Sequence, residues 1–367
     1  MQLKNLAKTV KGVMSGKRGV CFRETDCAEE LIYPEEKFSM PELLDIEGKP
    51  HRFFEAYETT IPPFYVRSLK NGICYTSGEE VYTGGGQVIL AHTTQKTAPP
   101  VRWRRFLGSV TRIRGKVAHL GQSRAENNYY LWIVECLGRL HLIRKSGFRP
   151  DFYVISNTLN FQKEWLELLG IREQQIISAD VGVSIQADEL IVPSFINNWE
   201  IVDFRDGYTY YQKQWLPRWI GDLYSGFRTE SGNGRERVYI SRANAPCRKV
   251  VNEDSLLPLL GKYGFTVVRS ENLTVREQIE TFANAEVVAG PHGAGLANCA
   301  LCSPHTSVLE IYPQYYQSSG LRIMLSALNL RYFYMMGETS DTSMRPQQEN
   351  VCVDPEKFEA ALKMLIA

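Results

Sequence analysis

The chain has 367 residues, of which 44% are hydrophobic and 23% are charged. This composition is typical of a globular protein, and the length suits two domains with a central cleft between them. The formal net charge of +1 provides no overall attraction to nucleic acid, so we expect no nucleic-acid partner.

Cysteine content and hydropathy bear on the cellular compartment. The 8 cysteines are too sparse in a chain of this length to form a disulfide framework, which favours a reducing compartment. No stretch approaches the roughly 20 apolar residues that cross a bilayer, and the N-terminus lacks the continuous apolar core of a secretory signal. We therefore expect a cytoplasmic protein.

Residues 1–36 form a basic segment. Within residues 1–18, basic side chains occur without any acidic one; they are Lys4, Lys8, Lys11, Lys17 and Arg18. Apolar residues recur there at helical spacing, namely Leu3, Leu6, Val10, Val13 and Met14. One interpretation is a helix that lies on an anionic membrane surface, at the inner face of the membrane. A basic tail, or a helix packed on the domain, is equally compatible with the pattern.

Residues 37–228 are predicted to form an N-terminal α/β domain. Up to about Leu120 the sequence is punctuated by Pro, Gly and short alternating runs, which indicate strands and loops with few helices. The segment "NNYYLWIVECLGRLHLI" then shows helical spacing and ends before Gly147 and Pro150. Short apolar strands alternate with a helix after it, which is typical of a parallel, doubly wound sheet.

Residues 229–367 are predicted to form a second, Rossmann-like domain after the polar linker "RTESGNGRER". Its strands are read in "VYIS", "FTVVRS", "EVVAG", "SVLEIY" and "RYFYMM", and helices alternate with them. Asn252 is predicted to cap the first helix, and the last helix is a candidate to pack back on the N-terminal domain. The predicted fold class is therefore α/β, with two open α/β units that face a central cleft.

The stretch "VVAGPHGAGLA" leads from an apolar strand into a glycine-rich turn and a helix. Ligands of open α/β sheets bind beyond the carboxyl ends of strands, and Gly290, Gly293 and Gly295 would let backbone N–H groups approach an anion closely. His292 can donate a hydrogen bond to the same anion. The turn is therefore interpreted as a phosphate cradle, although glycines also close such junctions for packing reasons.

Two arginines and a glutamate add to this pattern. Ser241 and Arg242 follow the first strand of the second half, and Arg248 lies on the next loop, where guanidinium groups would suit a pyrophosphate. Arg248 is equally compatible with a surface loop. Glu310 interrupts an apolar strand, so it needs a partner, either a ribose hydroxyl or a neighbouring arginine.

The Ser-Arg, Asn-Glu, Glu-Gln-Ile, Pro-His-Gly-Ala-Gly-Leu and Glu-Ile elements of this half resemble, in order, those of glycosyltransferase family 61. That family includes bacterial capsular polysaccharide enzymes, plant xylosyltransferases and EGF-domain O-GlcNAc transferase. The resemblance covers residues 235–313 well and residues 62–142 more weakly. It implies the GT-B arrangement of two Rossmann-like domains, and inversion of the anomeric configuration without a bound metal.

The resemblance also implies roles for individual residues. The diphosphate of the donor would be bound by Ser241, Arg242, Arg248, His292, Gly293, Ala294 and Gly295. Glu310 would contact the nucleoside, and His292 would take part in catalysis.

On the acceptor side, the family has an Asn-Tyr, His, aromatic, Asp/Glu pattern on a helix of the N-terminal domain. Here Asn128, Trp132 and Glu135 keep parts of this pattern, but Leu131 replaces the His. Glu135 is the predicted catalytic base, and Arg139, one helical turn further on, is its alternative ion-pair partner. Glu126, just before the helix, is the reserve base.

Cys299, Cys302 and His305 have a spacing found in zinc sites. No fourth ligand lies near them in the sequence, so we interpret the cysteines as small core residues and predict no metal. A hydrolase is excluded because the glycine-rich loop follows the only faint nucleophile motif, and a nicotinamide dehydrogenase is excluded because no G-x-G-x-x-G follows a strand.

The prediction is an inverting, metal-independent glycosyltransferase, a hexosyl- or pentosyltransferase that uses a nucleotide sugar, most simply a UDP-sugar, and no other cofactor. Its acceptor would be an oligosaccharide or lipid-linked glycan in the synthesis of a surface polysaccharide such as a capsule. The alternative is a nucleotide-sugar-binding module that has lost catalysis, because Leu131 replaces the family His.

Overall fold

The computed structural model describes residues 27–84, 110–122, 125–197, 201–205, 208–211, 214–228, 235–340 and 345–367. The predicted membrane-binding helix within residues 1–18 and most of the predicted linker lie outside these ranges. Among the described helices, none combines the length and the apolar composition needed to span a bilayer. The chain folds as two units, which are Met1–Glu36 with Pro62–Asn198, and Lys37–Ile61 with Trp199–Ala367.

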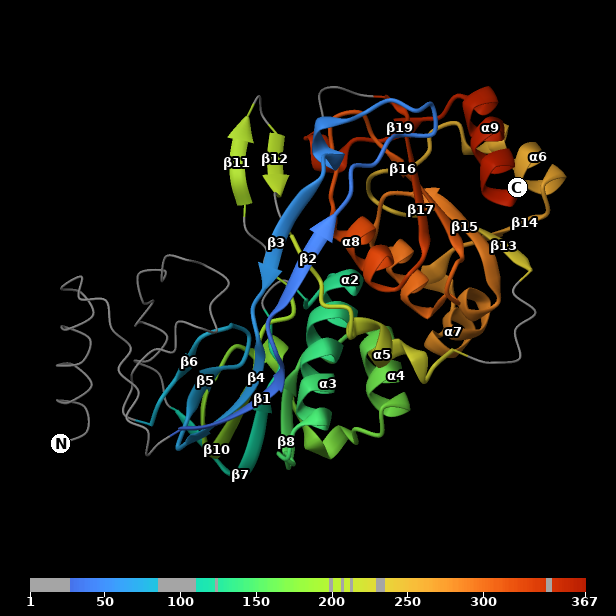
Figure 1. Ribbon diagram of the computed structural model, residues 1–367. Helices are drawn as coiled ribbons and strands as arrows, with labels where there is room; N and C mark the ends of the chain where they lie inside the picture. The colour runs from blue at the N-terminus through green and yellow to red at the C-terminus, as the bar shows by residue number, and fades with distance from the viewer. Residues whose placement is uncertain are drawn as a thin grey trace. The chain divides into compact units, whose positions relative to one another are not determined.

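The described part of the first unit contains an 8-stranded mixed sheet in the order β1-β4-β10-β7-β8-β9, with β5 paired to β10 and to β6 (Figure 1). Its strands are β1 (Cys27–Tyr33), β4 (Phe64–Lys70), β5 (Ile73–Tyr75), β6 (Val81–Tyr82), β7 (Thr111–His119), β8 (Phe152–Ile155), β9 (Ile176–Ser178) and β10 (Ser184–Pro193). The strands β10, β7, β8 and β9 are parallel, and the remaining pairs are antiparallel.

The predicted parallel sheet of this unit is thus confirmed only from β7 onward. Parallel neighbours need a long crossover, usually a helix, whereas antiparallel neighbours do not. Helices connect β7 to β8 and β8 to β9, but no helix longer than one turn occurs among the described residues between β1 and β6. The first strands therefore pair antiparallel.

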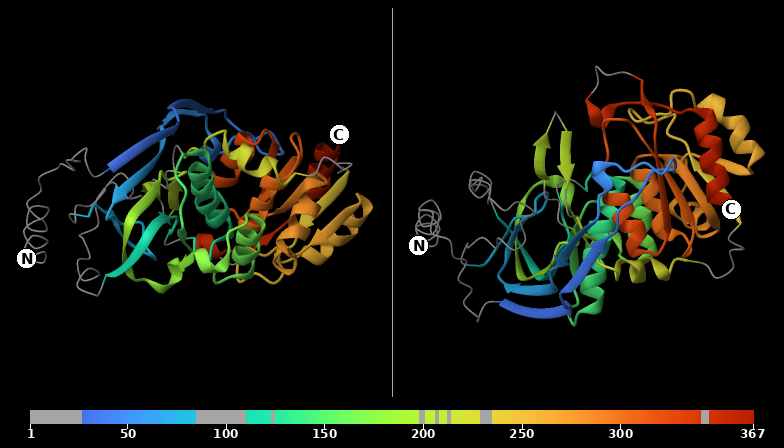
Figure 2. Two further views of the ribbon diagram at one scale, coloured as in Figure 1. Left: turned by 90° about the horizontal axis from the view of Figure 1, so that it is seen from below. Right: turned by 45° about the horizontal axis from the view of Figure 1, so that its top comes forward.

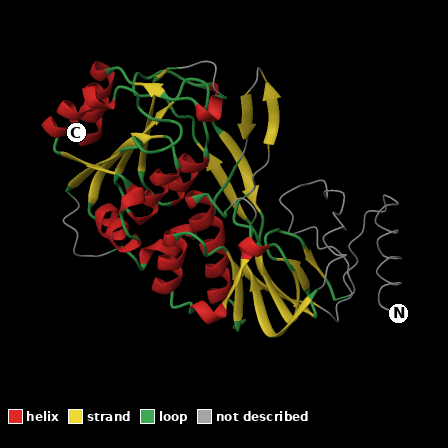
Figure 3. Cartoon of the chain, turned by 180° about the vertical axis from the view of Figure 1, so that it is seen from behind, coloured by secondary structure: helices red, strands yellow, loops and turns green. Residues whose placement is uncertain are grey.

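The predicted helix of the first unit is confirmed and has three parts, α2 (Tyr129–Leu131), η5 (Trp132–Cys136) and α3 (Leu137–Lys145), of which η5 is a π-helical turn. Asn128 caps it, since its side chain accepts a hydrogen bond of 3.0 Å from the backbone N–H of Leu131. α3 packs against β4 and β10 (Figure 3). Gly138 allows the close approach of Ile196. The next helix is α4 (Asn160–Leu168).

The second unit contains a sheet of five parallel strands in the order β14-β13-β15-β16-β17. They are β13 (Glu236–Ile240), β14 (Phe265–Val268), β15 (Ala285–Pro291), β16 (Ser307–Tyr312) and β17 (Arg331–Met336). The helical connections are α6 (Glu253–Lys262), α7 (Val275–Ala283), the 3₁₀ helix η9 (Ala294–Leu301), α8 (Gly320–Ala327) and α9 (Pro355–Ile366). The predicted Rossmann-like alternation is confirmed here.

Helices cover both faces of this sheet. On one face, α9 lies beside α6, and both pack on a core that includes Tyr239, Leu309 and Ile311 (Figure 2). On the other face, α7 and α8 both contact η9. Because side chains alternate along a strand, Glu310 points to the face opposite Leu309 and Ile311. The last helix is thus part of the core of the C-terminal sheet.

Two details differ from the sequence-based expectations. Asn252 precedes α6 as predicted, but its side chain does not cap the helix, because it bonds to both the N–H and the C=O of Val353. The compact units group residues 37–61 and 199–228 with the C-terminal sheet, whereas the predicted domains were 37–228 and 229–367. Those predicted limits stay a prediction.

Smaller elements complete the described structure. The two-stranded sheets are β2 (Glu36–Met40) with β3 (Tyr57–Ile61), β11 (Ile201–Arg205) with β12 (Tyr208–Tyr211), and β18 (Glu338–Thr339) with β19 (Val351–Cys352). The short helices are η2 (Arg52–Phe54), η6 (Glu173–Gln175), η7 (Ala179–Val181), α5 (Ile220–Ser225), η8 (Ser270–Asn272) and η10 (Pro346–Gln348).

Candidate functional site

The strand order places a topological switch point between β13 and β15. The chain runs from β13 to β14 on one side and from β15 to β16 and β17 on the other, so the loops after β13 and β15 diverge. Ligands of doubly wound sheets bind in the crevice at such a point. Arg242 follows β13 and His292 follows β15, so the structure places two predicted donor-binding residues at the switch point.

Arg242 lies directly against the glycine-rich turn. A Cβ atom on Gly293 would collide with the guanidinium group, so glycine is needed here for the close approach of Arg242. Nη2 of Arg242 donates a 3.0 Å hydrogen bond to the carbonyl of Cys247, while the buried Nε has no partner among the described residues. Burial, followed by the charge of Arg248, lowers the pKa of Arg242. A bound anion would relieve both effects.

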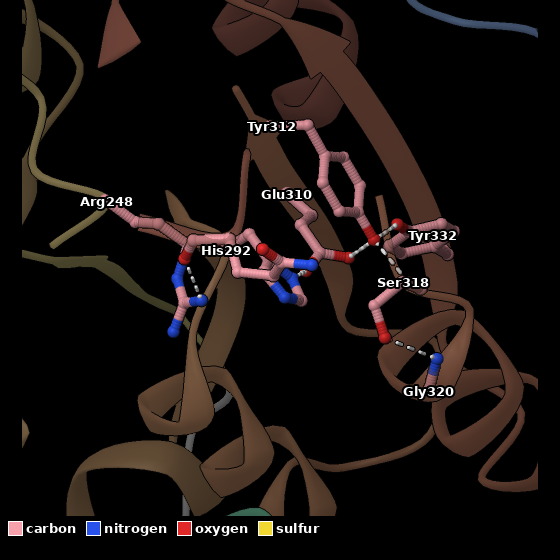
Figure 4. Close-up of polar contacts among 8 residues, drawn as sticks. Arg248, His292, Glu310, Tyr312, Ser318, Gly320 and Tyr332 are labelled. Atoms are coloured by element: carbon pink, nitrogen blue, oxygen red, sulfur yellow. Dashed lines mark hydrogen bonds and ion pairs between the residues drawn. The ribbon is translucent and has the colours of Figure 1, made fainter. Parts of the chain in front are cut away.

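Arg248 belongs to the same site and is not a free surface residue. Its backbone is left-handed, with φ of 56°, and its Nη1 donates a 2.8 Å bond to the carbonyl of Gln347. The guanidinium carbon lies 5.6 Å from the ring centroid of Tyr316. This fixed geometry positions a second positive charge close to His292 (Figure 4).

His292 and Glu310 form a pair at the carboxyl ends of β15 and β16. Nδ1 of His292 contacts Oε1 of Glu310, and Oε2 lies 2.7 Å from the hydroxyl of Tyr312 and 2.5 Å from that of Tyr332 (Figure 4). The Glu310 side chain is 0% exposed. The predicted alternative of an arginine partner is therefore wrong, and the nucleoside contact stays a prediction.

The remaining predicted donor-binding residues lie around the turn. Ser241 is buried, and its hydroxyl donates a 2.7 Å bond to Glu253. Gly293 directly precedes η9, Ala294 and Gly295 begin it, and all three residues are half-buried. The start of a helix offers N–H groups without intrahelical partners, which suits an anion.

Several residues of this site were missed in the sequence. Tyr312 lies two positions after Glu310 and so on the same face of β16, which the period of a strand predicts. Tyr316 and Tyr332 come from a loop and from β17, and no local signal identifies them. Ser270 has a buried hydroxyl with no partner among the described residues, 3.7 Å from where a Cβ of Gly295 would lie.

In the first unit, the predicted base Glu135 lies in the π-helical turn η5. Its side chain is 0% exposed, and Oε2 accepts a 3.0 Å bond from the N–H of Ile196, just after β10. The alternative pairing with Arg139 is not the main contact, because Arg139 donates to the carbonyls of His119 and Gly121 at 2.7 and 3.1 Å. Both side chains thus hold η5 and α3 at the carboxyl ends of β7 and β10.

Glu126 has a different environment. It lies before α2 and is half-buried, and burial together with the nearby charge of Asp180 raises its pKa. Trp132, a predicted acceptor-side residue, is fully buried and donates a 3.0 Å bond from Nε1 to the carbonyl of Ser156. Of the predicted acceptor-side residues, Asn128 and Glu126 are the ones that solvent reaches.

Buried polar atoms without a described partner gather after the parallel strands of the first unit. They are Oε1 of Gln122, Oγ of Ser156, Oδ1 of Asp180 and both side-chain polar atoms of Asn197. Each residue lies within a few positions of the carboxyl end of β7, β8, β9 or β10. Such atoms are costly unless a ligand or water satisfies them.

Cys299 and Cys302 are both fully buried, as expected for small core residues. In the part of the chain that the structure describes, no three His, Cys, Asp or Glu side chains are grouped as a metal site requires.

Comparison with known sequences identifies the family to which part of the chain belongs. The profile of the family described as Glycosyltransferase 61 matches residues 129–309, from the start of α2 into β16. Residues 129–309 of the chain therefore belong to glycosyltransferase family 61. The resemblance seen in the motifs is thereby confirmed.

A curated relative supports this assignment. Alpha-1,3-arabinosyltransferase XAT3 of Oryza sativa subsp. japonica is 29% identical over 122 residues, which are 30% of this chain and 21% of the rice protein. The match thus spans about a fifth of the length of that relative.

Proposed function

We propose that the chain is a glycosyltransferase that moves a sugar from a nucleotide sugar to a glycan or lipid-linked acceptor, with inversion and without a metal. The observation that carries this proposal is the convergence of Arg242, Arg248 and His292 on the Gly293 turn at the switch point of a Rossmann-like sheet. A UDP-sugar is the proposed donor, and a pentose is among the candidate sugars because the rice relative is an arabinosyltransferase.

The GT-B arrangement of the two units is part of the proposal and is supported by family membership and by the C-terminal sheet. Synthesis of a surface polysaccharide, a cytoplasmic location and membrane contact through residues 1–18 are also proposed; the last two rest on the sequence alone. Leu131, which is 3% exposed and replaces the family His, is the observation that favours the alternative of a binding module without catalysis.

The chemistry needs a stabilised leaving group. In a single displacement, the acceptor oxygen forms a bond to C1 of the sugar while the bond from C1 to the phosphate oxygen breaks, and its electron pair stays on the diphosphate. Arg242, Arg248, His292 and the N–H groups at the start of η9 would stabilise that charge. Because the site excludes much of the solvent, these groups act more strongly than they would in water.

The acceptor hydroxyl must lose its proton to a base. We propose Glu126 for this role in preference to Glu135, because Glu126 is open to solvent and its raised pKa brings it closer to that of an efficient base. The polar atoms of Gln122, Asp180 and Asn197 that have no described partner, which follow the parallel strands of the same unit, would bind hydroxyl groups of the acceptor sugar.

A thermal-shift screen of nucleotides, followed by a transfer assay, tests the proposed function. A nucleoside diphosphate at 100 times its dissociation constant should stabilise the protein by about 2.7 kcal/mol. Radiolabelled sugar should then appear on a glycan acceptor. Stabilisation without transfer or donor hydrolysis would favour the binding module, and absence of stabilisation by every nucleotide would contradict both functions.

Gly293→Ala is expected to weaken nucleotide binding about tenfold or more, equivalent to ~1.4 kcal/mol, because the new Cβ would displace the Arg242 guanidinium. Calorimetric titration with UDP measures the effect. Gly261→Ala is the matched control: it lies in α6, and a Cβ there meets no atom within 4 Å. This control should leave binding unchanged and raise the free energy of unfolding by about 0.5–1 kcal/mol. Equal UDP affinity in both variants would contradict the placement of Arg242.

A further inference from the structure

The carboxylate of Glu310 is fully buried, and both of its oxygens contact protein groups. Oε1 contacts Nδ1 of His292, and Oε2 lies within hydrogen-bond distance of the hydroxyls of Tyr312 and Tyr332 (Figure 4). The Tyr312 hydroxyl also lies 2.7 Å from the carbonyl of Ser318, which holds this ring in place. When both oxygens of a buried carboxylate already contact protein groups, its main effect is on those groups and not on a ligand.

We propose that Glu310, held by Tyr312 and Tyr332, is a positioning residue that keeps a proton on Nδ1 of His292 and makes His292 the site of proton uptake when a nucleoside diphosphate binds. This inference rests on the proposed function, because it takes the diphosphate of the donor as the ligand. It gives Glu310 a role different from the nucleoside contact that family resemblance implies.

The orientation of the imidazole follows from its surroundings. An ionised carboxylate only accepts hydrogen bonds, so Nδ1 of His292 must carry a proton. The ring is stacked on Tyr312 at 5.0 Å between centroids, and Tyr316 meets it edge-on at 5.3 Å. The His292 side chain is 13% exposed, and Nε2 has no hydrogen-bond partner among the described residues. Nε2 is therefore the atom left to meet a ligand.

The charges that face His292 oppose one another. Burial lowers its pKa most, Glu310 raises it, and Arg248 and Arg242 lower it further, so that the pKa lies below the ordinary value for histidine. The ring is therefore neutral in the free protein at pH 7. A diphosphate would offset the two guanidinium charges, and Glu310 would then stabilise an imidazolium ion.

This proton has a use in the reaction. Once His292 has taken it from solvent, Nε2–H can donate a hydrogen bond to the diphosphate. When the bond between C1 and the phosphate oxygen breaks, the electron pair on that oxygen is stabilised by this donor. Since the complex binds more protons than the free protein, affinity for the diphosphate should fall as pH rises through the pKa of His292 in the complex.

Histidine NMR on the full chain tests the positioning role without any ligand. The chain has 6 histidines, and His292→Gln assigns the signal of interest after selective ¹⁵N labelling. The wild-type protein should show the tautomer that is protonated on Nδ1. In Glu310→Gln, that preference should weaken, and the titration midpoint of His292 should fall by about one pH unit, because a negative charge is removed.

Two tyrosine variants keep the test informative if Glu310→Gln fails to fold. Tyr332→Phe removes a hydrogen-bond donor from Oε2 of Glu310 and leaves more of the negative charge of that carboxylate to act on His292, so the His292 midpoint should rise. Tyr334→Phe is the matched control: it lies on the same strand, and its buried hydroxyl has no partner among the described residues. An unchanged tautomer and midpoint in Glu310→Gln, or equal midpoints in the two tyrosine variants, would overturn the positioning role.

Calorimetry with UDP in buffers of different ionisation enthalpy tests proton uptake. Near pH 7.5 the wild-type protein and Tyr334→Phe should take up a proton on binding, and Glu310→Gln should take up less. Binding of UDP without uptake would overturn the uptake while the NMR result stands. Failure of UDP to bind at all would count against the proposed function, and the NMR result would still decide whether Glu310 positions His292.

Discussion

Arg242→Ala is expected to lower kcat/KM for sugar transfer by about 10²–10³-fold, which is the loss seen when one donor to a developing negative charge is removed. Arg242 lies against the Gly293 turn, and its Nε has no partner among the described residues, so part of the guanidinium is available to an anion. The folded protein should tolerate the change, because within the described residues Arg242 donates one hydrogen bond, to the carbonyl of Cys247.

Steady-state kinetics with saturating acceptor measures this loss, with Arg276→Ala as the matched control. Arg276 is exposed on α7 and should keep wild-type turnover. Arg242→Lys should give an intermediate rate, because lysine keeps the charge but not the planar fork that binds a diphosphate at two points. Wild-type kcat/KM in Arg242→Ala would show that the donor diphosphate binds elsewhere.

The residues that lie at the carboxyl ends of the strands in the second sheet could be predicted from the sequence, because local patterns identify them. Short apolar runs identify the strands, and the carboxyl ends of parallel strands share one edge. Arg242 and His292 each follow such a run, so their meeting was predictable without knowledge of the strand order. The order itself, with β13 between β14 and β15, needs contacts between distant segments and has no local signal.

The partners of buried polar residues were harder to predict. The sequence indicates that Glu310 needs a partner, since it interrupts an apolar strand, but it does not say which side chains surround it. One partner follows β15, one lies on β16 and one comes from β17, so the answer depends on strand register. The same reason explains Asn252, whose side chain bonds to a residue 101 positions away instead of capping its own helix.

In the first unit, helical spacing predicted which residues are neighbours but not what their side chains contact. It correctly predicted that Glu135 and Arg139 lie one turn apart, and it offered an ion pair between them. Both side chains are fully buried, and the Arg139 guanidinium donates its hydrogen bonds to the carbonyls of His119 and Gly121. Spacing on a helix shows which residues are neighbours, but the packing of that helix on a sheet decides what each side chain contacts.

Glu126→Gln is expected to lower kcat by about 10²–10⁴-fold while UDP binding is unchanged, because a glutamine cannot take the proton of the acceptor hydroxyl. Activity of the wild-type protein should rise with pH as Glu126 loses its proton. Since burial and then Asp180 raise the pKa of Glu126, the midpoint of this rise should lie above that of an ordinary glutamate. Glu167→Gln, at an exposed position on α4, is the matched control and should keep wild-type kcat.

Glu135→Gln separates the two candidate bases. Glu135 is among the groups whose negative charge favours the charged form of buried Arg139, so its neutralisation should lower the free energy of unfolding, which urea denaturation measures. The protein that stays folded should retain turnover, because the Glu135 carboxylate is enclosed and already accepts a bond from Ile196. If Glu135→Gln instead abolished turnover at normal stability while Glu126→Gln stayed active, Glu135 would be the base, and η5 would have to open to admit the acceptor.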